Sequence, residues 1–540
     1  MRIRLVGCLI VAATGSVAAQ ANDTGTITVV IGGEPTRPVR LLADGKADTD
    51  VASMLFLPLA WLGKRLTTAD EKSFEPALAR QWSRRDPLTL VFDLDPRAKW
   101  HDGVRVTARD VVWSLNLARD SAAFPVYALL LREVASVTAE TSERVVVKFK
   151  RAYPEQLYDA VFHVHPLPAH LLDTIPANRL EESNFAAAPI GSGPYRYGAR
   201  EPGRQVELLA NRDFFLGPVK LTRVVFLIAR NAEAQLNLLL DGSADAFESA
   251  VLARQISPVV GKPNLRIITQ PWLSVGYLLF NRKAYGDRSA PHPILADPAV
   301  RRAIVQAIDR PTMVRSVFGP YGAPAEGPMG QASWIRRIAP KQPGYDPARA
   351  RQLLKERGWV DTNGDGVLDK NGIPLSLRLS YPGSNIPRVA MAEPIQEMLR
   401  QIGVRIELLR LDGPVWGQRR QRGEFDIDFS QATLDPSPSG LVQSWSCAGI
   451  GGSNVASICD PDTDQALERA VLAQGETASR WREVIATIHA NGSAAFVFAP
   501  TQTMILSTRY RNVVTRPDAA WEFLWRWSVD PSQRIARDER

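Results

Sequence analysis

Residues 88–118 constrain the fold of this chain more than any other part of the sequence. Residues 88–94 alternate apolar and polar side chains, which predicts a β-strand with one buried face. Asp102-Gly103 then predicts a tight turn, because glycine tolerates the positive φ that a reversal needs. Thr107 precedes Asp110 by three residues, a weak form of the capping box that starts a helix. The stretch is therefore expected to fold as a strand, a turn and a capped helix, a structural unit without chemistry of its own.

The length of the chain indicates several domains. At 540 residues it is too long for one hydrophobic core, and about three domains are expected. A hydrophobic content of 45% and a charged content of 23% are typical of a soluble globular protein. The net charge of +8 is spread along the chain, and its densest basic cluster, Arg419, Arg420 and Arg422, is interpreted as a solvated helix face. No nucleic-acid partner is indicated.

The first residues predict export. Arg2 and Arg4 form a basic start, residues 5–17 are mostly apolar, and Ala19 and Ala21 are the small residues of a cleavage site. Residues 1–21 are therefore interpreted as a cleavable signal peptide. No later apolar run reaches the ~18 residues that span a bilayer, so we expect a soluble periplasmic protein.

The three cysteines have different predicted roles. Residues 5–8 imitate a lipoprotein cleavage box, but only seven residues precede Cys8, so no lipid anchor is expected. Removal of the signal peptide leaves Cys447 and Cys459 in an oxidising compartment, where a disulfide is the expected outcome. Closing this short loop would stabilise the protein by roughly 3 kcal/mol in the chain-entropy model.

Several separated motifs resemble one family. They are WHDG at 100–103 followed by TARDVVWSL at 107–115, PIGSGPY at 189–195, two helix starts at Asp297-Pro298 and Asp346-Pro347, and CDPDTDQALERA at 459–470. Together they resemble the family 5 extracellular solute-binding proteins, which deliver peptides, and in relatives nickel or opines, to ABC importers. The resemblance implies an α/β fold of the periplasmic binding protein type II class, with two lobes joined by hinge strands and an extra subdomain.

The resemblance also suggests domain boundaries. We expect lobe I to combine residues 22–55, 190–272 and 495–540, the extra subdomain II to cover 56–189, and lobe III to cover 273–494. The chain should cross between the lobes near residues 272–281 and again near 494–500, so that solute binding closes the two lobes around a cleft.

A βαβ unit is predicted in the third region. A strand at 374–381, a helix at 388–401 and a strand at 404–411 should cross right-handed with the strands parallel. Ligands of such sheets lie at the carboxyl ends of the strands, where Arg388 begins the helix. Arg388 resembles a family arginine that can receive a carboxylate, a role that suits a guanidinium.

The expected solute contacts come from several segments. They are Glu34, Trp272, Asn281, Arg388, Trp416 and Asp435. Glu34 follows two glycines in a loop that faces the cleft in the family, although an ordinary turn explains it as well. Peptide-binding relatives carry an acid where this chain has Ala432, with Asp435 or Asp428 as possible substitutes. The solute is therefore predicted to be a peptide or peptide-like molecule, with a non-peptide carboxylate, an opine or a metal chelate as alternatives.

No resident metal or cofactor is expected. His163 and His165 would share one face of a strand, and His170 follows, but solvated or core histidines are the favoured interpretation. Residues 361–369 match a calcium loop in part, yet position twelve is Gly372 where a glutamate is expected, which favours a polar turn.

The predicted function is binding rather than catalysis. The sequence contains no GxSxG elbow, no HExxH helix and no Walker A loop, which disfavours the alternative of a secreted hydrolase. The expected partners are a short peptide or small-molecule solute and a membrane-embedded permease with its ATPase subunits. The protein itself is expected to be a monomer.

Overall fold

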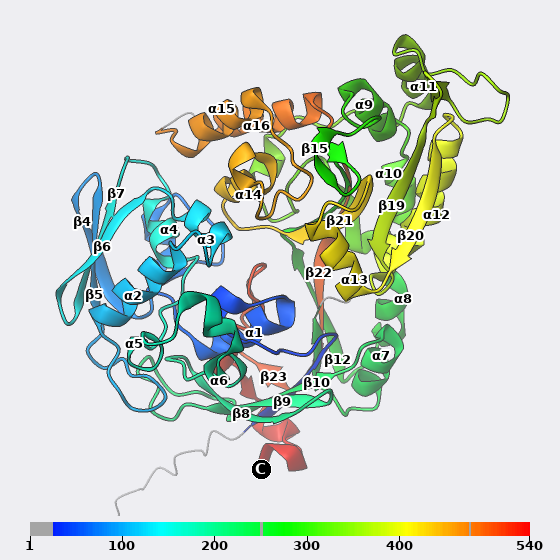
Figure 1. Cartoon of the computed structure of the whole chain (residues 1–540). Coiled ribbons are helices and arrows are strands. Elements are labelled where there is room, and N and C mark those ends of the chain that lie inside the picture. Colours follow the sequence, from blue (N-terminus) through cyan, green and yellow to red (C-terminus); the bar gives the residue numbers. More distant parts are fainter. Residues whose placement is uncertain (1–24, 249–251, 475–476, 540) are drawn as a thin grey trace, which may run out of the picture.

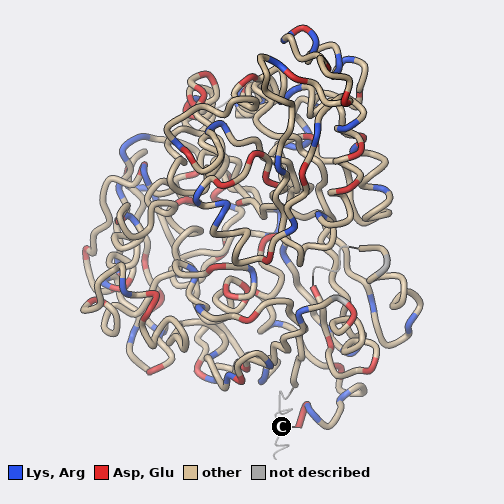
Figure 2. Tube along the Cα trace, turned by 45° about the vertical axis from the view of Figure 1, so that its right-hand side comes forward, with Lys and Arg blue, Asp and Glu red and all other residues tan. Residues whose placement is uncertain are grey.

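The computed structural model describes residues 25–248, 252–474 and 477–539 (Figure 1). The predicted signal peptide at 1–21, including Cys8, lies outside the described residues. Basic and acidic residues alternate along the described part of the trace, as Figure 2 shows. Within the described ranges, no helix has both the length and the apolar character needed to cross a membrane.

One long strand, β22 (Ala494–Ser507), organises the molecule. Its first half pairs with β13 (Ser274–Phe280), and its second half pairs with β11 (Ala246–Glu248) and β12 (Leu265–Pro271). The strand order is β20-β19-β21-β13-β22-β11-β1-β10-β9-β8, with β12 and β16 also paired to β22. Strand β22 therefore belongs to two half-sheets, and residues 272–273 carry the chain from one to the other a second time.

We use the name lobe I for the half-sheet that pairs with the second half of β22, together with its helices. It lies in the lower part of Figure 1. Its elements are β1 (Thr26–Ile31), α1 (Lys46–Leu55), β8 (Tyr195–Glu201), β9 (Gln205–Ala210), β10 (Arg223–Ile228), α7 (Ala232–Leu240), β11, α8 (Ala253–Ile256), β12, β23 (Tyr510–Arg511) and β24 (Ser528–Val529).

Subdomain II is the part built on the separate sheet β4-β5-β7-β6, on the left of Figure 1. Its elements are β2 (Ala60–Leu62), β3 (Phe74–Pro76), β4 (Ala79–Asp86), β5 (Thr89–Leu94), α2 (Ala108–Ala118), α3 (Pro125–Leu130), β6 (Val134–Thr141), β7 (Arg144–Phe149), α4 (Gln156–Val161), α5 (Ala169–Leu172) and α6 (Asn184–Ala187).

Lobe III is the half-sheet that pairs with the first half of β22, together with its helices, in the upper part of Figure 1. Its elements are β13, β14 (Lys283–Ala284), β15 (Asp287–Pro291), α9 (Pro298–Gln306), α10 (Arg310–Phe318), β16 (Gly322–Pro324), α11 (Pro347–Glu356), β17 (Asp369–Lys370), β18 (Ile373–Pro374), β19 (Ser376–Pro382), α12 (Ile386–Arg400), β20 (Arg405–Leu411), α13 (Gly413–Gln421), β21 (Ile427–Thr433), α14 (Leu441–Trp445), α15 (Pro461–Val471) and α16 (Thr477–Ala490). The predicted residue boundaries between the three regions remain a prediction.

The apolar run of β13 explains its central place. All seven of its residues are buried, because β21 and β22 flank the strand and cores lie on both of its faces. The predicted parallel unit is also present: β19 and β20 pair in parallel, and α12 connects them. The tryptophans Trp521, Trp525 and Trp527 are buried in the core shared by lobe I and subdomain II.

The predicted strand, turn and capped helix are observed as β5, the Gly103 turn and α2. The backbone N–H and the hydroxyl of Thr107 donate to the Asp110 carboxylate at 2.8 and 3.0 Å, so Asp110 forms its half of the predicted capping box. His101 joins this unit to the PIGSGPY turn, because its Nδ1 accepts from the N–H of Gly191 at 3.0 Å. Burial lowers the pKa of His101 to about 4, so the ring is a neutral structural contact at neutral pH.

Position 191 requires glycine because it has no space for a side chain. A Cβ there would lie 1.9 Å from the carbonyl oxygen of Leu55, closer than any side chain permits. The turn that carries Gly191 therefore packs directly on the end of α1.

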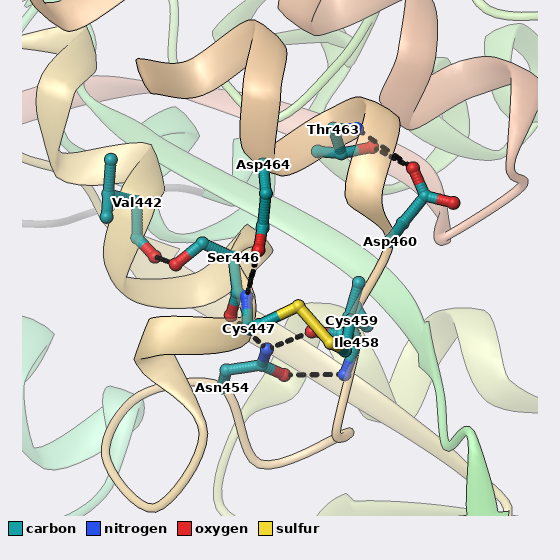
Figure 3. The surroundings of a disulfide bond; sticks show 9 residues. All are labelled: Val442, Ser446, Cys447, Asn454, Ile458, Cys459, Asp460, Thr463 and Asp464. Carbon is teal, nitrogen blue, oxygen red and sulfur yellow. Dashed lines mark hydrogen bonds between the residues drawn. A yellow bond between two sulfur atoms is a disulfide. The ribbon is translucent and has the colours of Figure 1, made fainter.

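The predicted disulfide between Cys447 and Cys459 is present, with an S–S distance of 2.03 Å (Figure 3). Asn454 holds the enclosed loop from inside, because its amide donates to the carbonyls of Ser446 and Ile458 at 2.8 and 2.6 Å. Asp464 of α15 accepts the backbone N–H of Cys447 at 3.0 Å. The crosslink and these bonds fasten the loop to lobe III.

Candidate binding cleft

Three adjoining cavities form a cleft between the lobes. Cavity A, of about 490 Å³, lies in lobe III beside β21, α13 and α14, with Val126 of subdomain II in its wall. Cavity B, of about 520 Å³, is lined by α1, by subdomain II and by the loop after β21. Cavity C, of about 830 Å³, lies between β1, α1 and α7 of lobe I and the loop 383–387 of lobe III. Asp435 lines both A and B, and Asp50 lines both B and C, so neighbouring cavities share wall residues.

Two arginines and one carboxylate form an arginine pocket in lobe III. The guanidinium groups of Arg388 and Arg420 lie 5.0 and 5.7 Å from the ring centroid of Trp416. Asp428 is fully buried beneath them and accepts from Trp416 Nε1 at 2.7 Å, from Arg420 Nε at 3.0 Å and from the hydroxyl of Ser430. Two guanidinium groups face this single carboxylate, so the arginine pocket keeps one positive charge in excess.

Arg388 is the more deeply buried of the two arginines, with 7% of its surface exposed. It lies at the start of α12, where Asn385 caps the helix by accepting the N–H of Arg388 at 3.2 Å. Its guanidinium donates to the carbonyl of Phe429 at 2.8 Å, whereas its Nε has no partner within the described residues. Burial lowers the pKa of Arg388 to about 10, and the side chain remains charged at neutral pH.

The interpretation of residues 419–422 as a solvated face is wrong for Arg420. The Arg422 side chain is 60% exposed, as expected, but that of Arg420 is 21% exposed and lines cavity A. The difference arises because the Arg420 guanidinium donates to Asp428 of β21, whereas Arg422 pairs with Glu424. Sequence spacing alone did not show which arginine would meet this strand.

Lobe I has the opposite charge balance in an acidic cluster of Lys46, Asp50 and Glu248. The Lys46 ammonium lies 2.6 Å from Asp50 and 2.7 Å from Glu248, between two carboxylates. Gln502 of β22 also donates to Glu248, at 2.5 Å. Burial raises the pKa of Asp50 to about 7, with Lys46 opposing the rise and Glu248 adding to it. Lys46 and Asp50 are close enough in the sequence for their pairing to be expected in a helix. Glu248 is 202 residues away from Lys46, so its contact was not predictable from local spacing.

The predicted contact residues lie in different parts of the cleft. Trp416 and Asp435 line cavity A, Trp272 lines cavity B and Glu34 lines cavity C. Arg388 lines none of the three cavities; it is buried, with its guanidinium 5.0 Å from the ring centroid of Trp416, which does line cavity A. The Glu34 carboxylate is already paired with Arg200 at 2.7 Å, and that hydrogen bond, despite desolvation, lowers the pKa of Glu34.

Asn281 does not line any of the three cavities. The residue is 1% exposed, and its amide donates to the carbonyls of Gly423 and Phe425 at 3.1 and 2.9 Å. These bonds hold the segment that leads into β21. The structure therefore places Asn281 in a structural position, and its predicted contact with solute is not supported by this geometry.

The histidines of 163–170 are not arranged as a metal site. His163 and His165 lie in the loop after α4, and His170 lies in α5, so the three do not share one strand. His163 contacts Asp159 at 3.3 Å, His165 the carbonyl of Phe56 at 3.2 Å and His170 the carboxylate of Asp102 at 2.8 Å. Among the residues that the structure describes, no group of three or more potential ligands could hold a metal ion.

The calcium-like segment at 361–369 forms a turn. The two oxygens of Asp361 accept the backbone N–H groups of Gly364 and Gly366 at 2.7 and 3.0 Å. Gly364 and Gly366 have φ values of 77° and 81°, which favour glycine. The acidic side chains therefore organise the turn.

The architecture defines a class of protein: two lobes joined by two crossings around a charged cleft. Comparisons with known proteins agree. Residues 73–452 match the model of the bacterial extracellular solute-binding proteins, family 5. The oligopeptide-binding protein AppA of Bacillus subtilis is 31% identical over 421 residues, covering 76% of this chain and 74% of that protein.

Solved structures show the same fold. The structure of AppA from Bacillus subtilis in complex with a nonapeptide has a TM-score of 0.84 at 25% identity, covering 94% of this chain and 99% of that one. NikZ from Campylobacter jejuni in complex with Ni(L-His) has a TM-score of 0.81 at 23% identity, covering 93% and 99%. The chain belongs to the family 5 extracellular solute-binding proteins and has their type II periplasmic binding protein fold.

Proposed function

We propose that this protein captures a peptide or peptide-like solute that carries a carboxylate, and delivers it to an ABC importer. The observation that carries the proposal is the excess positive charge of the arginine pocket beside cavity A, in a chain of this family. The relative from Bacillus subtilis is an oligopeptide-binding protein, and its solved structure contains a nonapeptide. A solute carboxylate would neutralise the positive charge of the arginine pocket that Asp428 does not neutralise.

The cleft supports binding by lobe closure. Solute in cavities B and C would touch lobe I and lobe III together, because residues of both line these cavities. Subdomain II also reaches lobe III: Ser437 donates to Glu155 at 2.6 Å, and Arg151 pairs with Glu468 at 2.6 Å. Rotation about β22 and residues 272–273 would open and close these contacts.

The proposal also covers the compartment and the partners of the protein. The predicted signal peptide and the disulfide fit a periplasmic protein without a lipid anchor. A membrane permease with ATPase subunits would take the solute, and a monomer would suffice to bind it. The role is binding without chemical conversion, in agreement with the family.

The test begins with the protein purified gently from the periplasm. Mass spectrometry of the released ligand should identify a peptide or another carboxylate-bearing solute, and adding that solute back should raise the melting temperature. Solution scattering should show a smaller radius of gyration with solute. An unchanged radius at saturation would indicate a rigid pocket, and peptidase or esterase activity without thermal stabilisation would support a hydrolase.

A non-peptide carboxylate is the second candidate. Ala432 lines cavity A without contributing a charge, so nothing at that position selects a free amine. An opine or a metal chelate with a carboxylate would therefore meet the same arginine pocket. The mass of the released ligand distinguishes these solutes from a peptide.

A further inference from the structure

Helix α3 of subdomain II forms part of the cleft wall and rests on lobe III. Val126, Tyr127 and Leu130 of this helix line cavities A and B. The neighbouring Leu129 packs on the hydrophobic core of lobe III, and α3 contacts α14 of that lobe (Figure 1). The position of this part of the wall therefore depends on how firmly subdomain II is held against lobe III.

An ion cluster joins the end of α3 to α15 of lobe III. It consists of Arg132, Glu133, Arg151 and Glu468. Arg132 lies two residues after the end of α3, and its guanidinium is 3.2 Å from the Glu468 carboxylate. Arg151 lies 2.6 Å from Glu468 and 3.1 Å from Glu133. Glu468 is the member that lobe III contributes, so the cluster spans the two parts of the molecule through this carboxylate.

The helix that carries Glu468 is itself fixed to lobe III. Asp460, which caps α15, directly follows Cys459 of the disulfide. Asp464, one turn before Glu468, accepts the backbone N–H of Cys447 at 3.0 Å (Figure 3). Helix α15 also packs against α16. The position of Glu468 is therefore set by lobe III, and its ion pairs can restrain the chain that follows α3.

The ion cluster is only partly buried. The side chain of Glu133 is 6% exposed, whereas those of Arg132 and Glu468 are 27% and 43% exposed. Partly exposed pairs stabilise a protein little and are weakened by salt, although a network of charges holds better than a single pair. Loss of Glu468 would leave both arginines beside Glu133 alone. We therefore expect this loss to loosen subdomain II without unfolding the protein.

We propose that Glu468 is a positioning residue for solute binding, which pairs with Arg132 and Arg151, keeps α3 at the cleft and slows the release of solute. This inference rests on the proposed function, because it concerns how long the same solute stays bound. Glu468 lines none of the three cavities and so acts through α3. The rate of association should change little, because the ion pairs form when the cleft closes, after solute has entered.

The test uses the full-length mature protein loaded with a tryptic digest of casein. Excess peptide is removed by rapid desalting, and mass spectrometry then measures over time which peptides remain on the diluted protein. Glu468→Gln should shorten the half-time of release about three- to tenfold, because two partly exposed ion pairs are lost together. High salt should shorten the half-time of the wild type as well, and should affect Glu468→Gln less.

Matched variants separate positioning from a general effect of charge. Glu483 has a side chain that is 41% exposed and pairs with Arg469 at 2.6 Å inside lobe III, so Glu483→Gln should release peptides at the wild-type rate. Glu468→Arg should release peptides faster than Glu468→Gln, because it repels both arginines. Combining Glu468→Arg with Arg151→Glu restores a pair of opposite charges and should slow the release again. Such a rescue would not occur if Glu468 only stabilised its own helix.

Each outcome supports or overturns the inference. Equal half-times in the wild type and Glu468→Gln, equal acceleration by Glu468→Gln and Glu483→Gln, or no rescue by the exchanged charges would overturn it while the proposed function stands. Capture of no peptide by the wild type would instead contradict the peptide function. Solution scattering of the ligand-free protein then decides: a larger radius of gyration in Glu468→Arg than in the wild type supports the inference, and equal radii overturn it. Melting curves and circular dichroism confirm that each variant is folded.

Discussion

The arginine pocket of lobe III and the acidic cluster of lobe I each combine three charged side chains, but their net charges are opposite. In lobe III, two arginines have one carboxylate near them, that of Asp428, which accepts directly from Arg420 and attracts the charge of Arg388. In lobe I, Asp50 and Glu248 share one ammonium, that of Lys46. Each cluster has one charge in excess, of opposite sign, and each borders the cleft.

The two clusters differ in how the excess charge can be removed. An arginine keeps its proton at any physiological pH, so the positive charge of lobe III requires an anion. In lobe I, burial raises the pKa of Asp50 to about 7, so a proton can remove the negative charge near neutral pH. The comparison teaches that lobe III has a permanent preference for an anionic group, whereas the charge of lobe I depends on pH.

The largest expected effect follows from removing the shared carboxylate of lobe III. Asp428→Asn would leave the buried Arg388 and the partly buried Arg420 without a counter-charge, and breaking a buried pair costs about 3 to 5 kcal/mol. Urea unfolding should show this loss in the free energy of unfolding. Glu407→Gln, an exposed acid of β20, is the control and should change little. A free energy of unfolding equal to that of the wild type would show that water, rather than Asp428, stabilises the two guanidinium groups.

The next effect concerns solute binding. Arg388→Ala should weaken binding of the native solute more than tenfold, because truncating a charged partner in a closed cleft costs about 2 to 5 kcal/mol. Calorimetry with the identified solute measures the change. Arg400→Ala, at the other end of α12 and 69% exposed in its side chain, should bind normally. Unchanged affinity in Arg388→Ala would mean that this arginine has only a structural role.

The disulfide provides a covalent difference between the lobes. The loop that Cys447 and Cys459 enclose contributes Gly451, Gly452 and Ser453 to cavity A, whereas lobe I has no cysteine to crosslink its wall. Replacing both cysteines by serine should lower the free energy of unfolding by about 3 kcal/mol. Guanidinium unfolding of oxidised and reduced wild-type protein is the matched comparison. Two free thiols in periplasmic protein would contradict the crosslink.

The smallest effect is the pH dependence of lobe I. Because the pKa of Asp50 is raised in the folded protein, its contribution to stability is complete below about pH 4 and is lost as the pH rises through about 7. Glu248→Gln removes a neighbouring negative charge, so this loss should shrink by on the order of 1 kcal/mol, equal to about one pKa unit. Urea midpoints between pH 4.5 and 8 measure it. Parallel curves for the variant and the wild type would show that Glu248 does not act on Asp50.

The sequence by itself determined the local elements and the covalent link. The capping box at Thr107 and Asp110, the helix start after Asp297 and the parallel β19-α12-β20 unit depend on residues close together in the chain, and all are observed. The pairing of Cys447 and Cys459 was predictable because no other cysteine remains after the predicted cleavage. Motifs spread along the chain also indicated the family and the fold, which the comparisons confirm.

Only the tertiary structure decided which charges meet at the cleft. Arg419, Arg420 and Arg422 look alike in sequence, yet Arg420 alone of the three contacts Asp428, because only its side chain faces β21 at that point. Lys46 meets Glu248 across 202 residues, a pairing that no local pattern encodes. The physical reason is that hydrophobic periodicity reports which face of an element is buried, whereas the partner of a buried charge depends on how distant elements pack.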